Sequence, residues 1–377
     1  MRQIGFALTP LLLFLTACTN IGFPSVVTGA PVLTYTAFGD SITAGAGLSD
    51  TANQAYVALI AHQYGLTFID RAYTGDQACD IPTRQIFPYS VASSLAQPTF
   101  YTLLISTNDV DVKGTGPYEA VFNLCHQAAL SWVALPTDFK VLATAASVVT
   151  TGLGHLESTN NWNAWTTDAA NSSVTFPVKL ATAGPVYAWY RIIDVNTGTF
   201  SWSIDQNAGG TVAGSTTTAT TPAIATLNGY NNSLALLRLP AIPAGAHTIT
   251  FTQTSPGAAG MGIVAVGVPP ATRTSAIPRV LAGTTPRQLQ AADGGSAACS
   301  VTDAPCLQYS ADIAANVALL ATDGLDVELF TTATYMQGAT VDMIDSVHPN
   351  ALGHTEIAHA IEDTISQGAA PASRRRP

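Results

Sequence analysis

The two ends of the chain alternate short apolar runs with helical patterns, and this alternation constrains the fold more than any other feature. Five runs have the length and composition of buried strands: residues 32–38, 66–69, 100–105, 279–282 and 325–330. Four segments between them have helical spacing of apolar residues: 53–64, 118–133, 311–322 and 353–366. Such alternation predicts an α/β fold, a parallel sheet with helices on both faces.

The middle of the chain, residues 151–270, lacks the helical period. Runs at 186–193 and 199–204 flank the turn sequence 194–198, which is a hairpin signal. Three further alternating runs follow at 234–239, 247–252 and 262–268. We therefore predict an antiparallel β-sandwich-like insert. It divides the α/β domain into a first part, residues 32–150, and a second part, residues 271–368, before a basic tail at 369–377.

Charge and hydropathy exclude several classes of protein. Only 10% of the residues are charged and 47% are hydrophobic, which is unlike a disordered acidic chain. With 14 Lys and Arg against 24 Asp and Glu, the net charge of -10 argues against nucleic acid as a partner. The mean hydropathy of +0.26 raises the question of a membrane protein. The apolar run at residues 6–17 is, however, shorter than the roughly 20 residues that span a bilayer.

That apolar run has the layout of an export signal. Arg2 precedes it, and it ends in Leu-Thr-Ala-Cys at residues 15–18. The ending resembles the lipobox of bacterial lipoproteins, which implies a signal peptide at 1–17, lipidation of Cys18 and a linker at 18–31. The alternative is an ordinary secretory signal with a chance cysteine. We expect an exported cell-envelope lipoprotein, facing the periplasm or the cell surface, that contacts the membrane through its N-terminal lipid.

The four remaining cysteines are Cys79, Cys125, Cys299 and Cys306. An even number in an exported chain favours disulfides. Cys299 and Cys306 enclose a short loop and form a plausible pair, which leaves Cys79 with Cys125, although three pairings are formally possible. A zinc site is disfavoured because no Cys-x-x-Cys is present.

A candidate nucleophile follows the first predicted strand. Ser41, in Gly39-Asp40-Ser41, stands between that strand and a predicted helix, at the carboxyl edge of the sheet where open α/β folds bind ligands. Its backbone N–H could face a developing oxyanion. The alternative is a turn with a helix cap.

A candidate base lies near the other end. His348 precedes Pro349, which can occupy the first position of the last helix, and Asp345 stands three residues before the histidine. A nucleophilic serine needs a base, and the base needs an acceptor that fixes its tautomer. The alternative is a capping carboxylate beside a surface histidine. Gly75 and Asn108 follow the second and third strands and can supply further donors to an oxyanion.

Together, and in this order, these blocks resemble the GDSL/SGNH hydrolase family over about residues 32–135 and 278–365. The resemblance implies a catalytic triad of Ser41, His348 and Asp345. It implies an oxyanion hole formed by the backbone N–H groups of Ser41 and Gly75 and the side chain of Asn108. The chain departs from the family pattern at Ser106, where glycine is usual, and at Asp70, where asparagine is common.

The resemblance implies a flavodoxin-like, three-layer α/β hydrolase domain. It also implies a serine esterase that works through an acyl-enzyme and requires no metal or organic cofactor. We expect the protein to be a monomer. Our first expectation for the substrate is O-acetyl groups on a polysaccharide. A short-chain carboxylesterase, lipase or lysophospholipase is a second reading. A non-catalytic carbohydrate-binding surface lipoprotein is a third.

Aromatic residues gather in the predicted insert: Trp162, Trp165, Tyr187, Trp189, Tyr190 and Trp202. They could form a sugar-stacking surface or the core of the sandwich. Strand alternation places Tyr187 and Trp189 on one face and Tyr190 on the other, so we expect at least one ring to face outward.

Overall fold

The computed structural model contains a five-stranded, all-parallel sheet in the order β16-β15-β3-β1-β2. Its strands are β1 (Thr34–Gly39), β2 (Thr67–Asp70), β3 (Thr99–Leu104), β15 (Val280–Gly283) and β16 (Val327–Phe330). In chain order this is the 2-1-3-4-5 arrangement of flavodoxin-like sheets. The structure describes residues 34–89, 99–114, 116–159, 162–193, 198–213, 232–257, 260–270, 278–286, 304–336 and 342–368.

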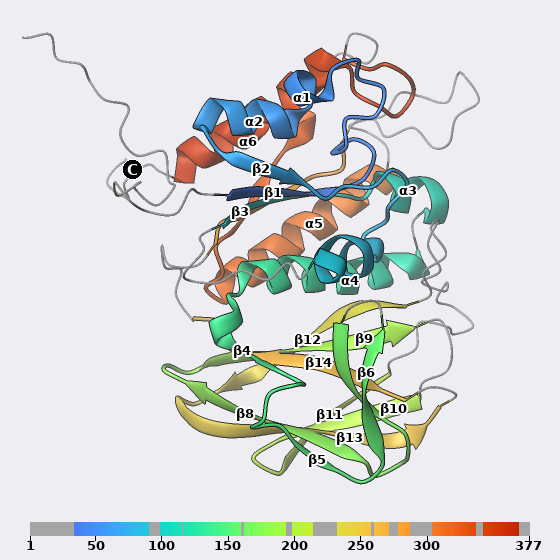
Figure 1. The fold of residues 1–377 in the computed structure, drawn as a ribbon, viewed down its shortest axis with the longest axis vertical. Coiled ribbons are helices and arrows are strands. Elements are labelled where there is room, and N and C mark those ends of the chain that lie inside the picture. Colours follow the sequence, from blue (N-terminus) through green and yellow to red (C-terminus); the bar gives the residue numbers. More distant parts are fainter. Residues whose placement is uncertain are drawn as a thin grey trace, which may run out of the picture.

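Helices cover both faces of this sheet (Figure 1). On one face lie α1 (Thr51–Gln54), α2 (Tyr56–Tyr64) and α6 (Ala351–Gly368), and on the other α4 (Pro117–Ala134) and α5 (Ala304–Thr322). A short helix, α3 (Thr107–Lys113), follows β3. Each face has its own core, with Tyr35, Ile60 and Ile361 on the α2/α6 side. The predicted parallel sheet with helices on both faces is confirmed.

Two antiparallel sheets lie between α4 and β15 in the chain. One has the order β12-β9-β14-β7-β6, with β4 also paired to β14, and the other β11-β10-β13-β8-β5. The strands are β4 (Lys140–Leu142), β5 (Val149–Thr151), β6 (Gly154–Thr159), β7 (Trp162–Thr167), β8 (Ser173–Leu180), β9 (Gly184–Ile193), β10 (Gly198–Ile204), β11 (Asn207–Ala213), β12 (Asn232–Ile242), β13 (Gly245–Pro256) and β14 (Gly262–Gly267). The sandwich strands thus begin at Lys140, ahead of the boundary at 151 expected from the sequence, because β4 pairs with β14.

Strand β9 is buried on both faces, so the expectation that one of its aromatic rings faces outward is wrong. Tyr190 packs edge-on against Phe200 of the other sheet, with ring centroids 5.6 Å apart. On the opposite face, Trp189 packs against Trp132 of α4 at 5.3 Å. Tyr187 donates a 2.7 Å hydrogen bond to Asp323, at the end of α5. Alternation fails as a guide to exposure here because the helical layer covers the outer face of this sheet.

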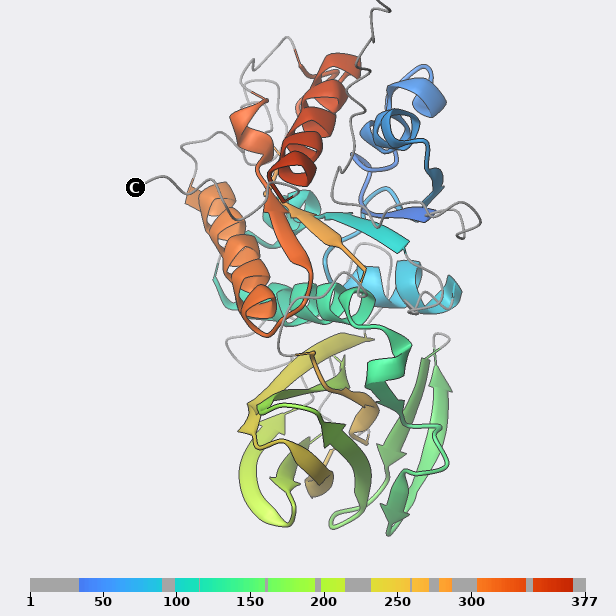
Figure 2. The same ribbon diagram turned by 90° about the vertical axis from the view of Figure 1, so that its left-hand side faces the viewer.

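The α4/α5 layer is therefore shared by the two parts of the molecule. Figures 1 and 2 show the parallel sheet on one side of these helices and the sandwich on the other. Every residue of α4 from Ala128 to Ala134 is buried, which uses all sides of the helix. The Nε1–H of Trp189 donates to Ser131 on α4 at 2.9 Å. One continuous core joins the α4 side of the parallel sheet to the interior of the sandwich.

A disulfide joins Cys79 to Cys125 on α4. Cys299 lies outside the described residues, as do the expected signal peptide at 1–17, Cys18, the linker at 18–31 and the tail at 369–377. Among the helices that the structure describes, none combines the length and apolar character needed to cross a membrane.

Candidate active site

The structure brings Ser41, His348 and Asp345 together from opposite ends of the chain. His348 Nε2 lies 3.0 Å from Ser41 Oγ, and His348 Nδ1 lies 2.9 Å from Asp345 Oδ2. Ser41 is 3% exposed, whereas the side chains of His348 and Asp345 are 25% and 53% exposed. These contacts form an unbroken relay from a hydroxyl through an imidazole to a carboxylate, the arrangement needed to activate a nucleophile.

The backbone around Ser41 is a series of turns rather than the start of a helix. The Asp40 carboxylate accepts the N–H of Ile42 at 2.9 Å, and the Asp40 carbonyl accepts the N–H of Ala44 at 3.1 Å. The first helix begins only at Thr51. Ser41 is thus held by a local hydrogen-bonded turn at the carboxyl end of β1, which lies between β3 and β2 in the sheet.

A tight turn also orients His348, the predicted base. Asp345 Oδ1 accepts the backbone N–H groups of Val347 and His348, at 2.8 and 2.7 Å. Partial burial raises the pKa of Asp345, but the hydrogen bonds from His348 and Val347 outweigh it, so the net pKa is below the usual value. The carboxyl group is therefore ionised at neutral pH and can stabilise an imidazolium at His348.

The helix that follows begins at Ala351 rather than at Pro349. Asn350 Oδ1 accepts the N–H groups of Leu352 and Gly353, at 2.9 and 3.2 Å, and so caps α6. Pro349 precedes this cap, which differs from the expected position at the first residue of the helix. The cap fixes where α6 starts, and with it the turn that carries His348.

The other two predicted oxyanion residues flank Ser41. Gly75 follows β2 and Asn108 follows β3, the two neighbours of β1 in the sheet. Asn108 Nδ2 donates to the carbonyl of Asp76 at 2.9 Å, so the two flanking loops meet across the end of β1. This bond uses one Nδ2 hydrogen, and no other described residue accepts the second. Gly75 has a φ of +85°, a conformation that favours glycine.

Ser106, the departure from the family pattern, adopts a conformation that suits glycine. Its φ is +137° and its ψ is -15°. The residue is fully buried, and its hydroxyl donates to the hydroxyl of Thr285 at 2.9 Å. A positive φ of this size favours glycine, and a buried hydrogen bond accompanies the serine that occupies the position.

Each of the blocks that carry Ser41, Gly75 and Asn108 also contains a buried aspartate next to the predicted site residue: Asp40, Asp76 and Asp109. Burial raises the pKa of Asp40 and of Asp76 to about 7, and that of Asp109 to about 8. Asp109 accepts the N–H of Ala78, and Asp40 that of Ile42. These carboxyl groups accept hydrogen bonds that stabilise the turns around the site. The aspartate that recurs beside each predicted site residue is the sequence feature that could have revealed this role.

Gln85 is a further structural residue of the site that sequence reasoning missed. It exchanges two hydrogen bonds with the backbone of Gly39, at 3.0 and 2.7 Å, and donates to Asp76 at 2.7 Å. It therefore ties the end of β1 to the turn after Gly75. No motif marks it, because the π-helix η1 (Ile81–Ile86) that presents it has no distinct sequence pattern.

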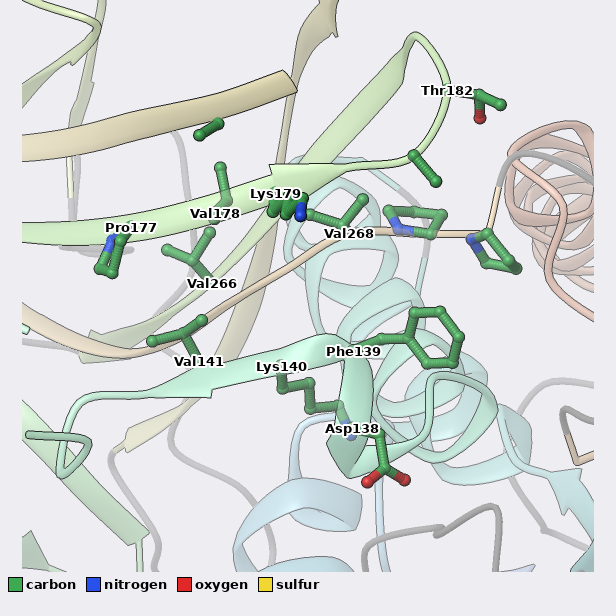
Figure 3. Close-up of a pocket in the computed structure, with 14 residues that line it drawn as sticks. Asp138, Phe139, Lys140, Val141, Pro177, Val178, Lys179, Thr182, Val266 and Val268 are labelled. Atoms are coloured by element: carbon green, nitrogen blue, oxygen red, sulfur yellow. The ribbon is translucent and has the colours of Figure 1, made fainter. Parts of the chain in front are cut away.

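Within the described part of the chain, no cluster of three or more His, Cys, Asp or Glu side chains could hold a metal ion. A cavity of about 540 Å³ does lie in the sandwich, between β4, β8 and β14 (Figure 3). Val141, Val178 and Val266 line it, and none of the predicted site residues does. This cavity is therefore not part of the predicted site, whose residues lie at the edge of the parallel sheet.

The comparison with protein families adds to this geometry. Residues 37–179 match the GDSL-like lipase/acylhydrolase family. The matched segment is less than half of the chain, and it contains Ser41, Gly75 and Asn108 but not Asp345 or His348. It supports an ester-hydrolysing enzyme. No curated protein matches the chain.

Solved structures give remote similarities. A member of the lipolytic G-D-S-L family from Veillonella parvula is 11% identical, with a TM-score of 0.41 over 88% of this chain and 97% of that one. A two-domain esterase active on acetylated mannans is 12% identical, with a TM-score of 0.36 over 62% of this chain and 90% of that one. A CBM36 carbohydrate-binding module is 15% identical, with a TM-score of 0.25 over 34% of this chain and 96% of that one.

Proposed function

We propose that the protein is a serine esterase that forms an acyl-enzyme at Ser41. The Ser41 oxygen attacks the ester carbonyl while His348 Nε2 takes its proton, and His348 then returns that proton to the leaving alcohol. Water next attacks the acyl-enzyme with His348 again as the base, which releases the acid and restores Ser41. The hydrogen-bonded relay from Ser41 to Asp345 is the observation that carries the proposal.

The oxyanion of both tetrahedral intermediates needs donors in place before the reaction. We assign this role to the backbone N–H groups of Ser41 and Gly75 and to the second Nδ2 hydrogen of Asn108. The bond from Asn108 to Asp76 supports the assignment, because it fixes the amide beside the turn that follows Gly75. Asp345 remains an anion and stabilises the imidazolium at each step.

For the substrate we propose O-acetyl groups on a polysaccharide. The exposure of His348 and Asp345 supports this choice, because a long polymer can reach a base that opens to solvent. A carboxylesterase, lipase or lysophospholipase would instead favour longer acyl chains. A non-catalytic carbohydrate-binding protein would have no need for the hydrogen-bonded series Ser41–His348–Asp345.

The test is labelling by a fluorophosphonate probe, followed by ester hydrolysis. We expect the wild-type protein to be labelled and Ser41→Ala not to be, with a loss in kcat of about 10⁴-fold or more for Ser41→Ala and for His348→Ala. Labelling that persists in Ser41→Ala would overturn the mechanism. Acetate release from acetylated xylan, compared with p-nitrophenyl esters of increasing length, tests the substrate: turnover of long chains alone would exclude the polysaccharide reading.

We also propose that Cys18 carries a lipid that tethers a monomeric enzyme to the cell envelope. The ending Leu-Thr-Ala-Cys at residues 15–18 supports this. In a bacterial host fed labelled palmitate, we expect label in the protein and its partition into detergent. Cys18→Ser should abolish both. Equal labelling of the two proteins would contradict lipidation at Cys18.

A further inference from the structure

Two arginines and two tyrosines form a contact cluster beside the catalytic edge, which we call the rim cluster: Arg71, Tyr73, Arg84 and Tyr89. The Arg71 guanidinium carbon lies 3.8 Å from the centre of the Tyr89 ring, and that of Arg84 lies 4.4 Å from the centre of the Tyr73 ring. The two tyrosine hydroxyls are hydrogen-bonded to each other. Each cation is thus held over an aromatic face, which limits its motion.

The rim cluster is continuous with the oxyanion turn. The N–H of Tyr73 donates to the carbonyl of Gly39 at 3.3 Å, at the end of β1 just before Asp40 and Ser41. Tyr73 also stands two residues before Gly75. Arg84 is ion-paired with Asp76, the residue after Gly75. A substrate whose carbonyl lies between Ser41 and Gly75 therefore has this cluster at its side.

The two arginines differ in how their charges are used. Arg84 has Asp76 as its carboxylate partner. Arg71 makes no ion pair with any described residue, and its Nε is buried without a hydrogen-bond partner in that part of the chain. The chain carries 24 acidic residues against 14 basic ones, so a half-buried arginine without a carboxylate is unexpected.

We propose that the rim cluster is a subsite for a carboxylate-bearing sugar residue in the alcohol part of the ester. The guanidinium of Arg71 presents a planar fork of donors that matches a carboxylate, and the Tyr89 ring holds it in position. Tyr89 is 41% exposed, so its ring also offers an apolar surface for the C–H face of the same sugar. The preferred substrate is then an O-acetylated acidic polysaccharide such as a polyuronate.

This inference rests on the proposed esterase function, and the experiment separates the two. Acetylated oligogalacturonides are compared with the same oligosaccharides after reduction of their carboxylates to alcohols, and p-nitrophenyl acetate reports on the catalytic machinery. We expect the wild-type kcat/KM to be about tenfold or more higher for the acidic form, mostly through KM. Arg71→Gln should bring this ratio close to one, while Arg71→Lys keeps the charge without the fork and should retain part of it.

The matched control is Lys179→Gln, which removes one exposed cation from β8 of the sandwich and should leave the ratio at its wild-type value. Equal kcat/KM for the acidic and reduced substrates, with normal hydrolysis of p-nitrophenyl acetate, would overturn the subsite and leave the esterase intact. A ratio that survives in Arg71→Gln would overturn it as well. Failure of the wild-type protein to hydrolyse any of the three esters would overturn the proposed function itself.

Discussion

Replacing Ser106 by glycine and, separately, by alanine tests whether backbone strain at this position lowers the free energy of unfolding. A non-glycine residue at a φ of +137° costs on the order of 1–3 kcal/mol. Both substitutions remove the hydrogen bond to Thr285, which is worth about 1 kcal/mol. Only glycine also removes the Cβ atom that makes this backbone conformation unfavourable. The difference between the two variants therefore isolates the strain.

The expected difference follows from these terms. Glycine normally lowers stability by roughly 0.5–1 kcal/mol relative to alanine, because it loses more backbone freedom on folding. The relief of strain at position 106 exceeds that loss, so Ser106→Gly should be more stable than Ser106→Ala by about 1 kcal/mol. The usual order of the two residues is reversed at this position.

Urea unfolding followed by tryptophan fluorescence measures both free energies, with the disulfide left intact. Ser131, a buried serine inside α4, gives the control pair. There Ser131→Gly should be less stable than Ser131→Ala by about 1 kcal/mol, since the site is an ordinary helical one. If Ser106→Ala equals or exceeds Ser106→Gly in stability, the backbone before Asn108 is not strained.

Three further predictions concern the oxyanion hole, the buried carboxyl groups and the shared core. Asn108→Ala should lower kcat on p-nitrophenyl acetate by about 10²–10³-fold; a change in KM alone would contradict its role. The raised pKa of Asp40 and Asp109 means that the folded state retains protons that the unfolded state releases near pH 4, so the free energy of unfolding should fall as the pH rises from about 4 to about 8. Urea midpoints across that range measure this fall, and Asp109→Asn should flatten it. Trp189→Ala should cost about 3–5 kcal/mol and leave a single unfolding transition; separate transitions for the sandwich and the α/β part would contradict a shared core.

The parallel sheet and the assembly of the triad could be predicted because local patterns determine both. Each strand of the sheet reads as a short apolar run, and parallel strands place their carboxyl ends at one edge. Ser41, Gly75 and Asn108 each follow such a run, so their meeting required no knowledge of packing. His348 and Asp345 are neighbours in the sequence, and one tight turn sets their contact.

The features that the sequence did not predict depend on contacts between distant segments. Strand β4 is three residues long, and only its pairing with β14 defines it. Gln85 gains its role from Gly39 and Asp76, and nothing within η1 indicates either partner. The exposure of Tyr190 and Trp189 depends on which layers cover β9, which alternation along one strand cannot reveal.

The sequence did contain a sign of the shared layer, in α4 itself. A helix that is apolar on one side covers one surface, whereas a helix that is apolar all round is buried on every side. Residues 128–135 of this chain, Ala-Ala-Leu-Ser-Trp-Val-Ala-Leu, have no charged member, so the helix they form must contact a second layer besides the parallel sheet. The sandwich is that layer.

The same contacts give the sandwich a part in supporting the site. Ser233 of β12 donates to the carbonyl of Cys79 at 2.7 Å, and Cys79 is bonded to Cys125 of α4. Cys79 stands between the oxyanion turn at Gly75 and the helix that carries Gln85. The segment that would complete the proposed oxyanion hole is therefore held by the parallel sheet on one side and by β12 on the other. A substitution that destabilises β12 should therefore also disturb the position of Gly75, because Ser233 of β12 donates a hydrogen bond to the segment that follows this glycine.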